Sequence, residues 1–389
     1  GLVLGLGRAG SALGPIIAGL NKIGAPTPNR VVALMSLGSL VGAAALYSVA
    51  GGSFQPWAER HALRFLIGIA IVIAMAMVRI EIWLKAAYPV YAIALLMLAL
   101  VPVLGIEALG ARRWIAVGGM TFQPSELMKL ALVAAIARYY QWLPVERLSH
   151  PRWVAIPLAM IVVPVILTMK QPDLGSAILF AALGLGLMFL AGVSVFYFAG
   201  GIIAALASLP LVWDRLHDYQ RRRVEIFLDP DKDPLGAGYH IAQSKIALGS
   251  GGVGGKGFMQ GTQGQLDFVP ETHTDFIVTM LGEEWGFAGL LVLLSLYVLM
   301  LVLMFSMAWR CDNRFGRLLI AGTALTLFVY VFINVAMVTG LVPVVGIPLP
   351  LVSYGGTSMM TLMVSMGLAM SGYVHGRVTI RNTETGPFW

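Results

Sequence analysis

The chain has 389 residues, of which 58% are hydrophobic and only 12% are charged, and its formal net charge is +7. A soluble domain of this size carries about 25% charged residues, so the composition excludes an ordinary soluble enzyme and indicates several membrane spans. The single cysteine, Cys311, excludes an intramolecular disulfide and a metal site with several cysteine ligands. In a membrane protein the basic residues report orientation rather than nucleic-acid binding.

Each long apolar run is predicted to be a helix, because an unsupported backbone cannot cross lipid. Residues 1–30 are expected to form a lead-in at the membrane interface, without the basic segment that would mark a signal peptide. The predicted fold class is an all-α polytopic integral membrane protein with about ten transmembrane helices. These helices are predicted near residues 31–50, 63–79, 86–104, 124–140, 153–169, 174–192, 194–212, 287–308, 318–340 and 357–375.

Basic residues in the short loops favour a cytoplasmic N-terminus. With that orientation the C-terminal tail, residues 378–389, is also cytoplasmic, and one long loop, about 213–273, lies outside. The cytoplasmic loops then hold most of the short-loop basic residues, namely Arg79, Lys85, Arg138, Arg147, Arg152, Arg310, Arg314, Arg317, Arg377 and Arg381.

The long outer loop is the main irregularity in this pattern. It contains a glycine-dense stretch, "LGSGGVGGKGFMQGTQGQ" (248–265), which a flexible linker would also show. The preceding "GYHIAQSKIALGS" (238–250) has apolar residues at helical spacing and predicts an amphipathic helix on the membrane. Loops of this length are usually functional or disordered, and we expect an ordered, functional loop.

The stretch "PETHTDFIVTMLGEEWG" (270–286) places acids directly before an apolar run. The segment from Asp275 to Trp309 would span roughly 50 Å as a helix, against a membrane core of about 30 Å. Residues 275–286 are therefore predicted to extend this helix beyond the membrane. Asp275 is then a carboxylate at the mouth of an outer cavity, able to take a proton. The alternative is that Thr274 or Asp275 caps the helix N-terminus.

Three further acids and one serine hydroxyl are predicted to lie on the outer side. Glu283 and Glu284 are interpreted as members of structural ion pairs. Asp173, in "KQPDLGSAIL", is either a helix N-cap or a contact to substrate or metal. Ser353 lies in the proline-rich stretch 334–358, where a regular helix is precluded and backbone N–H groups around residues 353–356 are placed to meet an anion. A re-entrant turn without a ligand is the alternative there.

The segment "GARRWIAVGGMTFQPSELMKL" (110–130) combines two arginines, a tryptophan and an internal charge pair. Arg112 and Arg113 suit phosphate recognition, and Trp114 suits a sugar face or a membrane interface. Glu126 and Lys129 are spaced i, i+3 within a span, which predicts a structural ion pair facing the bundle interior.

Several of these motifs resemble the SEDS family (shape, elongation, division and sporulation) in the family's order. The most specific is a long spaced pattern of Asn334, Gly340-Leu-Val-Pro343, Gly346-Ile and "LVSYGGTS" (351–358). "GARRWI", "QPSELMKL", "KQPDLG", "GSGGVGGKG" and "PETHTDFI" resemble further family blocks. The resemblance covers residues 31–377 and is greater to the elongation branch of the family than to the division branch.

The resemblance implies an inverting peptidoglycan glycosyltransferase in the bacterial cytoplasmic (inner) membrane. Such an enzyme polymerises lipid II at the outer face, and its leaving group is undecaprenyl diphosphate. The family's essential aspartate falls on Asp275 by motif position, and we assign it as general base. The resemblance further implies a partner, a class B penicillin-binding protein that crosslinks the strands.

The departing diphosphate needs positive charge. Arg112, Arg113, Lys245 and Lys256 are the candidate cations, with a divalent cation such as Mg²⁺ or Mn²⁺ on oxygen ligands as the other possibility. His273, beside the predicted base, is a candidate substrate contact. No His/Cys cluster indicates zinc.

Three other functions fit part of the pattern. A lipid II flippase would also use a broken helix near 343–356 and buried charges, although the sequence shows no inverted repeat. A scaffold that only recruits a transpeptidase would tolerate neutral residues in place of the cavity acids. A division-specific polymerase would use the same chemistry in another complex.

Overall fold

The computed structural model describes residues 28–108, 111–117, 120–213, 221, 225–229, 236–265, 271–378 and 380. Each of the ten predicted spans overlaps a helix in this part of the chain, and seven helices are long and apolar enough to cross a membrane. The lead-in up to residue 27 and most of the tail lie outside the described residues. The bundle helices are α2 (Pro28–Val49), α3 (Ala58–Met77), α4 (Ile80–Leu104), α5 (Pro124–Trp142), α6 (Pro151–Met169), α7 (Leu174–Ala191), α8 (Val195–Trp213), α12 (Ile277–Trp309), α13 (Arg314–Val338) and α14 (Gly356–Val374).

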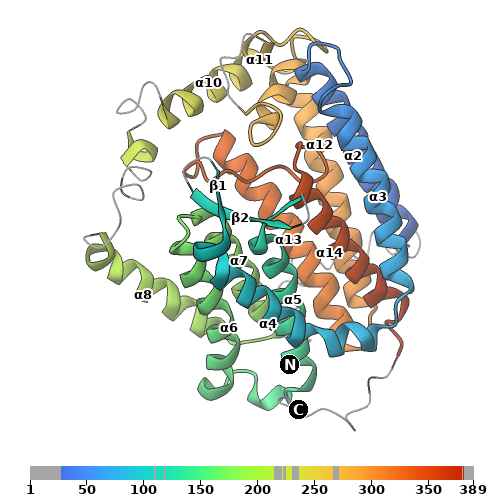
Figure 1. Cartoon of the computed structure of the whole chain (residues 1–389), viewed down its shortest axis with the longest axis vertical. Helices are drawn as coiled ribbons and strands as arrows, with labels where there is room; N and C mark the ends of the chain where they lie inside the picture. The colour runs from blue at the N-terminus through green and yellow to red at the C-terminus, as the bar shows by residue number, and fades with distance from the viewer. Residues whose placement is uncertain are drawn as a thin grey trace.

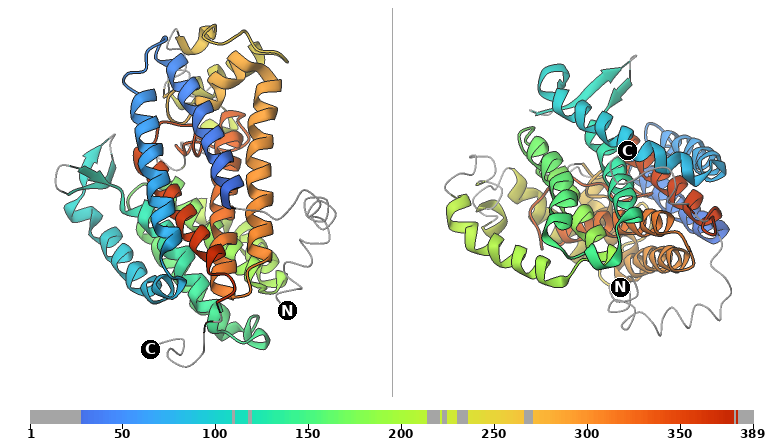
Figure 2. Two further views of the ribbon diagram at one scale, coloured as in Figure 1. Left: turned by 90° about the vertical axis from the view of Figure 1, so that its right-hand side faces the viewer. Right: turned by 90° about the horizontal axis from the view of Figure 1, so that it is seen from below.

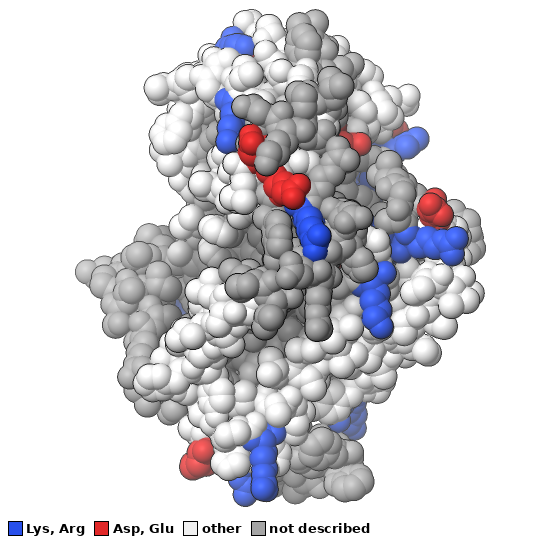
Figure 3. All heavy atoms as spheres, turned by 90° about the vertical axis from the view of Figure 1, so that its left-hand side faces the viewer, with Lys and Arg blue, Asp and Glu red and all other residues white. Residues whose placement is uncertain are grey.

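Local sequence explains where several of these helices begin. Prolines stand in the first turn of α5 and α6, where the missing N–H has no helical partner to lose. The side chain of Asn313 accepts a hydrogen bond from the Gly316 N–H at 2.6 Å and caps α13. On the face shown in Figure 3, the described Lys, Arg, Asp and Glu side chains lie from the top to about the middle and again at the lower end.

Helix α13 is the centre of the bundle. It is buried around most of its circumference and packs against α5, α7, α12 and α14. A helix that is apolar on all sides belongs in a core rather than on a surface. By contrast, α8 lies at the periphery (Figure 1), where Phe196, Ile203 and Leu206 are exposed. The bundle is therefore organised around its ninth predicted span.

A small antiparallel sheet connects α4 to α5, which adds strands to the predicted all-α fold. Its strands are β1 (Ile106–Ala108), β2 (Ala111–Val117) and β3 (Met120–Phe122), in the order β1-β2-β3. Trp114 pairs with Ile106, and Ile115 pairs with Phe122. The aromatic and β-branched residues of "RRWIAV" favour strands, but seven residues give too short a pattern to separate from a loop. Figure 2 shows the sheet projecting from the side of the helix bundle.

The loop predicted at about 213–273 has regular structure in its described part. It contains α10 (Ala237–Ser250) and α11 (Thr262–Gln265), which lie with the glycine-rich segment between them at the upper end of the bundle in Figure 1. The Ser244 hydroxyl hydrogen-bonds the Thr279 hydroxyl at 2.7 Å and the Val338 carbonyl at 3.0 Å. Helix α10 is thus fixed to α12 and α13 by buried polar contacts, whereas a flexible linker would have none.

Residues 251–257, the glycine turn, pack into a bend in α12. The helical extension predicted for residues 275–286 is present from Ile277. Gly286, with φ 68° and ψ −169°, interrupts the helix at the end of that extension. The bend frees backbone groups on both sides, and the glycine turn pairs with them. The bonds are Lys256 N–H to Glu283 O (3.0 Å), Gly257 N–H to Glu284 O (2.9 Å), Phe287 N–H to Gly252 O (2.9 Å) and Ala288 N–H to Val253 O (3.0 Å).

Close backbone approach in the glycine turn makes a stability prediction possible. Gly255 has φ +78°, and a Cβ there would collide with the Glu284 carbonyl oxygen. We expect Gly255→Ala to lower the free energy of unfolding in detergent by about 1–3 kcal/mol, because strain and clash combine. Thermal unfolding measures this. Gly254→Ala is the matched control, since a Cβ at Gly254 meets no atom within 4 Å. Equal stability of the two variants would contradict the proposed packing.

Candidate functional site

Three consecutive backbone carbonyls in the acid loop, residues 271–276, are held by distant donors. The donors come from α13 and from the proline loop, residues 341–355, which connects α13 to α14. Three outside donors on successive residues fix the path of the backbone up to Asp275. The bonds are Tyr354 N–H to His273 O (2.8 Å), Ser353 Oγ to Thr274 O (2.5 Å) and Asn334 Nδ2 to Asp275 O (2.9 Å).

The same donors also fold the proline loop. Asn334 is fully buried and donates a second bond to the Ile347 carbonyl at 2.6 Å. The Ser353 hydroxyl accepts a bond from the Leu349 N–H at 2.8 Å. The Ser353 hydroxyl therefore donates one hydrogen bond and accepts one within the protein. The hydroxyl thus has a structural role, and the contact between Ser353 and substrate stays a prediction.

Asp275 is half-buried, and its carboxylate does not cap helix α12. Helix α12 starts at Ile277 with Phe276 as its N-cap residue and no side-chain cap bond, so the capping alternative for Thr274 and Asp275 is wrong. Among the described residues no side chain is bonded to the Asp275 carboxylate. Gly346, at φ +71°, leaves room beside it, since a Cβ there would lie 3.2 Å from Oδ2.

Burial raises the pKa of Asp275 to about 6, and the negative charge of Glu271 adds to this effect. Glu271 itself adopts a left-handed backbone conformation, φ 53°, and accepts a bond from the Thr274 hydroxyl at 2.9 Å. Non-glycine residues rarely adopt this conformation, and such strain gathers at functional sites. The acid loop thus offers a carboxyl group that exchanges its proton near neutral pH.

An aromatic stack joins the acid loop to the start of α3. The His273 ring lies parallel to Trp57 with centroids 4.6 Å apart, and its centroid is 6.1 Å from that of Tyr354. The guanidinium carbon of Arg64, a residue of α3, lies 4.7 Å from the centroid of the Tyr354 ring. Sequence reasoning missed Trp57 and Arg64. The available signal was an arginine inside a predicted span, since ionisable residues in spans usually have a function.

The predicted phosphate-binding cations are dispersed. Arg112 is exposed on β2 with its Nε 3.7 Å from Glu107 Oε2, and Arg113 donates to the Pro172 carbonyl at 2.5 Å. Trp114 is half-buried on the same strand. Lys245 is exposed on α10 beside Gly340, and the fourth cation, Lys256, is bound to an acid. Arg112, Arg113 and Lys256 thus each have a contact within the protein, and their binding of phosphate stays a prediction.

Two of the predicted outer acids have structural partners. Glu283 is fully buried, and its Oε1 lies 2.6 Å from Lys256 Nζ and accepts bonds from the backbone N–H groups of Thr262 (2.9 Å) and Gln263 (3.1 Å). The predicted ion pair is present. Glu284 differs from the prediction: in the described part of the chain it accepts a hydrogen bond from the Ser48 hydroxyl and has no basic partner.

Asp173 is the N-cap of α7. Its Oδ1 accepts from the Ser176 N–H at 3.1 Å, and its Oδ2 accepts from the Ser176 hydroxyl at 2.7 Å. The capping interpretation is therefore confirmed. The alternative contact to substrate or metal stays a prediction, because each carboxylate oxygen keeps a lone pair beyond the bond it accepts from Ser176. Among the described residues, no three His, Cys, Asp or Glu side chains gather as they would to hold a metal.

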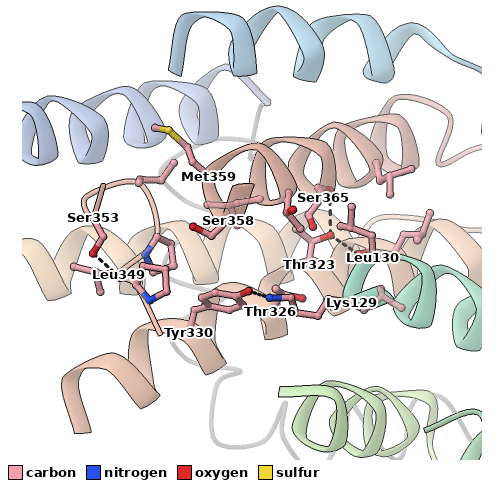
Figure 4. A pocket seen from close by; sticks show the side chains of 18 residues that line it. Lys129, Leu130, Thr323, Thr326, Tyr330, Leu349, Ser353, Ser358, Met359 and Ser365 are labelled. Carbon is pink, nitrogen blue, oxygen red and sulfur yellow. Dashed lines mark hydrogen bonds between the residues drawn. The ribbon is translucent and has the colours of Figure 1, made fainter. Parts of the chain in front are cut away.

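A pocket lies between α5, α13, α14 and the proline loop (Figure 4). Lys129 reaches into it, with Nζ 2.7 Å from Glu126 Oε1 and a further bond to the Tyr330 hydroxyl. The predicted ion pair is thus present and buried. Ser353 lines the pocket and also binds the acid loop, whereas Asp275 does not line it. The proline loop is consequently the wall that the pocket and the acid loop share.

The chain was compared with known families and proteins. A family model described as "Cell cycle protein", FTSW_RODA_SPOVE, matches residues 29–376. "Peptidoglycan glycosyltransferase MrdB" of Escherichia coli (strain K12) is 42% identical over 355 residues, which are 90% of this chain and 94% of MrdB. "Probable peptidoglycan glycosyltransferase FtsW" of Geobacter sp. (strain M18) is 39% identical over 318 residues, 80% of this chain and 85% of that protein.

Solved structures share the fold. A chain of a peptidoglycan synthase complex, described as showing structural coordination of polymerization and crosslinking, superposes with a TM-score of 0.77 at 32% identity. The match covers 90% of this chain and 97% of that chain. The rod shape determining protein RodA of Thermus thermophilus superposes with a TM-score of 0.68 at 27% identity, over 90% of this chain and 97% of RodA.

The buried ion pair beside the pocket generates a prediction that needs no assay of activity. We expect Lys129→Met to lower the free energy of unfolding by about 3–5 kcal/mol, because it leaves the Glu126 carboxylate buried without a cation. The double variant Glu126→Gln/Lys129→Met is expected to recover most of this loss. Chemical unfolding in detergent compares the three proteins. A double variant as unstable as the single one would show that the charge is not the cause.

Proposed function

The chain belongs to the FtsW/RodA/SpoVE family and is a multi-pass membrane peptidoglycan glycosyltransferase of the RodA type, and we propose that it polymerises lipid II with Asp275 as general base. Its role is rod-shape elongation. The single observation that carries the assignment of the base is the state of Asp275. It is a half-buried carboxyl group on a fixed backbone, with a side chain that no described residue binds.

The proposed reaction is an inverting glycosyl transfer. The Asp275 carboxylate takes the proton of the acceptor hydroxyl, and the oxygen of that hydroxyl forms a bond to the anomeric carbon of the donor. The bond from this carbon to the diphosphate oxygen breaks, and its electron pair leaves with undecaprenyl diphosphate. A base with a pKa near the working pH is best suited to accept the proton. The pKa of about 6 supports this role for Asp275.

The proposed location of the reaction is the outer face of the bacterial inner membrane, with both termini cytoplasmic. This proposal is supported by the gathering of the acid loop, α10 and α11 at one end of the bundle (Figure 1), opposite most of the short basic loops. A class B penicillin-binding protein is the proposed partner. The similar chain in a complex that coordinates polymerization and crosslinking supports it.

Replacement of Asp275 tests the function directly. We expect Asp275→Asn to reduce the polymerisation rate by about 10²–10⁴-fold, because the amide cannot take the proton. Its unfolding temperature should stay within a few degrees of wild type, since Asn334 binds the backbone carbonyl and not the carboxylate. The measurement is glycan chain formation from purified lipid II in detergent, where transport across a membrane has no meaning. A normal polymerisation rate would remove Asp275 from the mechanism.

The rate is also expected to depend on pH through Asp275. A general base works deprotonated, so the rate should rise with pH through about 6. Glu271→Gln removes the negative charge that raises the pKa of Asp275, and the rising limb should move to lower pH. A pH–rate profile of each protein measures this. Glu107→Gln, which removes an exposed acid on β1, is the matched control. A limb that stays in place in Glu271→Gln would contradict the assignment.

A further inference from the structure

Arg64 is a partly buried cation at the loop end of the bundle, whereas Arg112 and Lys245 are exposed. It is half-buried on α3, and within the described part of the chain it makes neither an ion pair nor a hydrogen bond. Lys256, Arg112 and Arg113 are each bound to an acid or a carbonyl. Partly buried charges are usually paired, because taking a charge out of water is costly. Arg64 therefore has charge and donors that the folded chain leaves unused.

The guanidinium of Arg64 is placed by two neighbours. Its carbon lies 4.7 Å from the centroid of the Tyr354 ring, so the ring supports it by a cation–π contact. On another side lies Gly356, where an added Cβ would be 3.2 Å from Arg64 Cζ. A larger residue at position 356 would push the guanidinium away. The proline loop and the first residue of α14 thus leave a space that fits this side chain.

The position of Arg64 is coupled to that of Asp275. The Tyr354 N–H donates to the His273 carbonyl at 2.8 Å, and the neighbouring Ser353 hydroxyl donates to the Thr274 carbonyl. The His273 ring also stacks on Trp57, immediately before α3. Tyr354 therefore contacts both the cation, through its ring, and the acid loop, through its backbone N–H.

The chemistry of Arg64 points to a phosphate group. A guanidinium has five N–H donors in a fixed fork that matches phosphate oxygens, and stacking on a ring leaves its edge free. A cation–π contact alone is worth about 0.5–1 kcal/mol at an exposed site and uses none of these donors. We propose that Arg64 binds the diphosphate of the polyprenyl-linked substrate and leaving group, an inference that rests on the proposed function. The sugar and peptide parts take no part in this contact.

Direct binding of undecaprenyl diphosphate to the full-length protein in detergent tests the proposal. Arg64→Gln is expected to raise the dissociation constant at least tenfold, which corresponds to about 1.4 kcal/mol. Arg64→Lys should lie between wild type and Arg64→Gln, since an ammonium keeps the charge but loses the fork. Arg152→Gln removes an exposed arginine at the start of α6 and should bind as wild type does. Unchanged binding by Arg64→Gln would overturn the proposal.

Two further ligands separate the sources of phosphate. Undecaprenol lacks the diphosphate and should bind wild type and Arg64→Gln equally. Short-chain phosphatidylglycerol carries a single phosphate ester and should also show no difference between them. If phosphatidylglycerol loses as much affinity as undecaprenyl diphosphate, Arg64 contacts membrane phospholipid and the diphosphate proposal fails. If undecaprenol loses as much, the variant has damaged the lipid site and the proposal fails as well.

A second variant covers the case in which Arg64→Gln does not fold. Gly356→Ala keeps the charge of Arg64 but displaces the guanidinium, and it is expected to weaken undecaprenyl diphosphate binding with a near-normal unfolding temperature. Wild-type affinity in Gly356→Ala would contradict the proposed position. Because binding needs no turnover, the result is separable from the fate of the proposed function. If Arg64→Gln loses binding and Asp275 proves dispensable for polymerisation, the Arg64 site is supported. Only the role of Asp275 as base is then removed.

Discussion

The carbonyl oxygens of His273, Thr274 and Asp275 are the points on which the geometry of the site depends. All three accept hydrogen bonds from Asn334, Ser353 and Tyr354, which belong to the end of α13 and the proline loop. Helix α12, which follows directly, has no side-chain cap to fix its first turn. The orientation of Asp275 is therefore imposed from outside its own segment. Because the bonds go to the backbone, the carboxylate stays free for chemistry.

The bend at Gly286 lies at the far end of the helical segment that follows Asp275. A helix that bends at Gly286 loses backbone hydrogen bonds, and unpaired backbone groups are costly where water is scarce. The glycine turn supplies those bonds and can approach closely because its residues lack side chains. An ion pair between Glu283 and Lys256 also holds the glycine turn against α12. Residues 277–285 are consequently held at both ends, by the acid loop contacts and by the glycine turn.

Charges in this protein divide by whether the fold provides a partner. Glu126 and Lys129 are both buried, and Glu283 is buried against a partly exposed Lys256. In each pair the two opposite charges compensate each other. Asp275 and Arg64 are half-buried and without a charged partner among the described residues. A folded protein retains such groups at a cost, and a ligand that completes them offsets that cost. The proposed base and the proposed phosphate contact are two such half-buried groups.

The sequence by itself determined the features that depend on local spacing. Apolar runs predicted the helices, the i, i+3 spacing predicted the Glu126–Lys129 pair, and the length before Trp309 placed Asp275 beyond the span. Only the tertiary structure decided which groups are already satisfied. Asp173 caps its own helix, and Ser353 joins the acid loop to the proline loop. Arg64 has neither an ion pair nor a hydrogen bond among the described residues. The bend at Gly286 and the sheet also depended on contacts between segments far apart in the chain. Which segments pack together depends on the relative energies of many alternative contacts. The sequence pattern of one segment does not specify its partner.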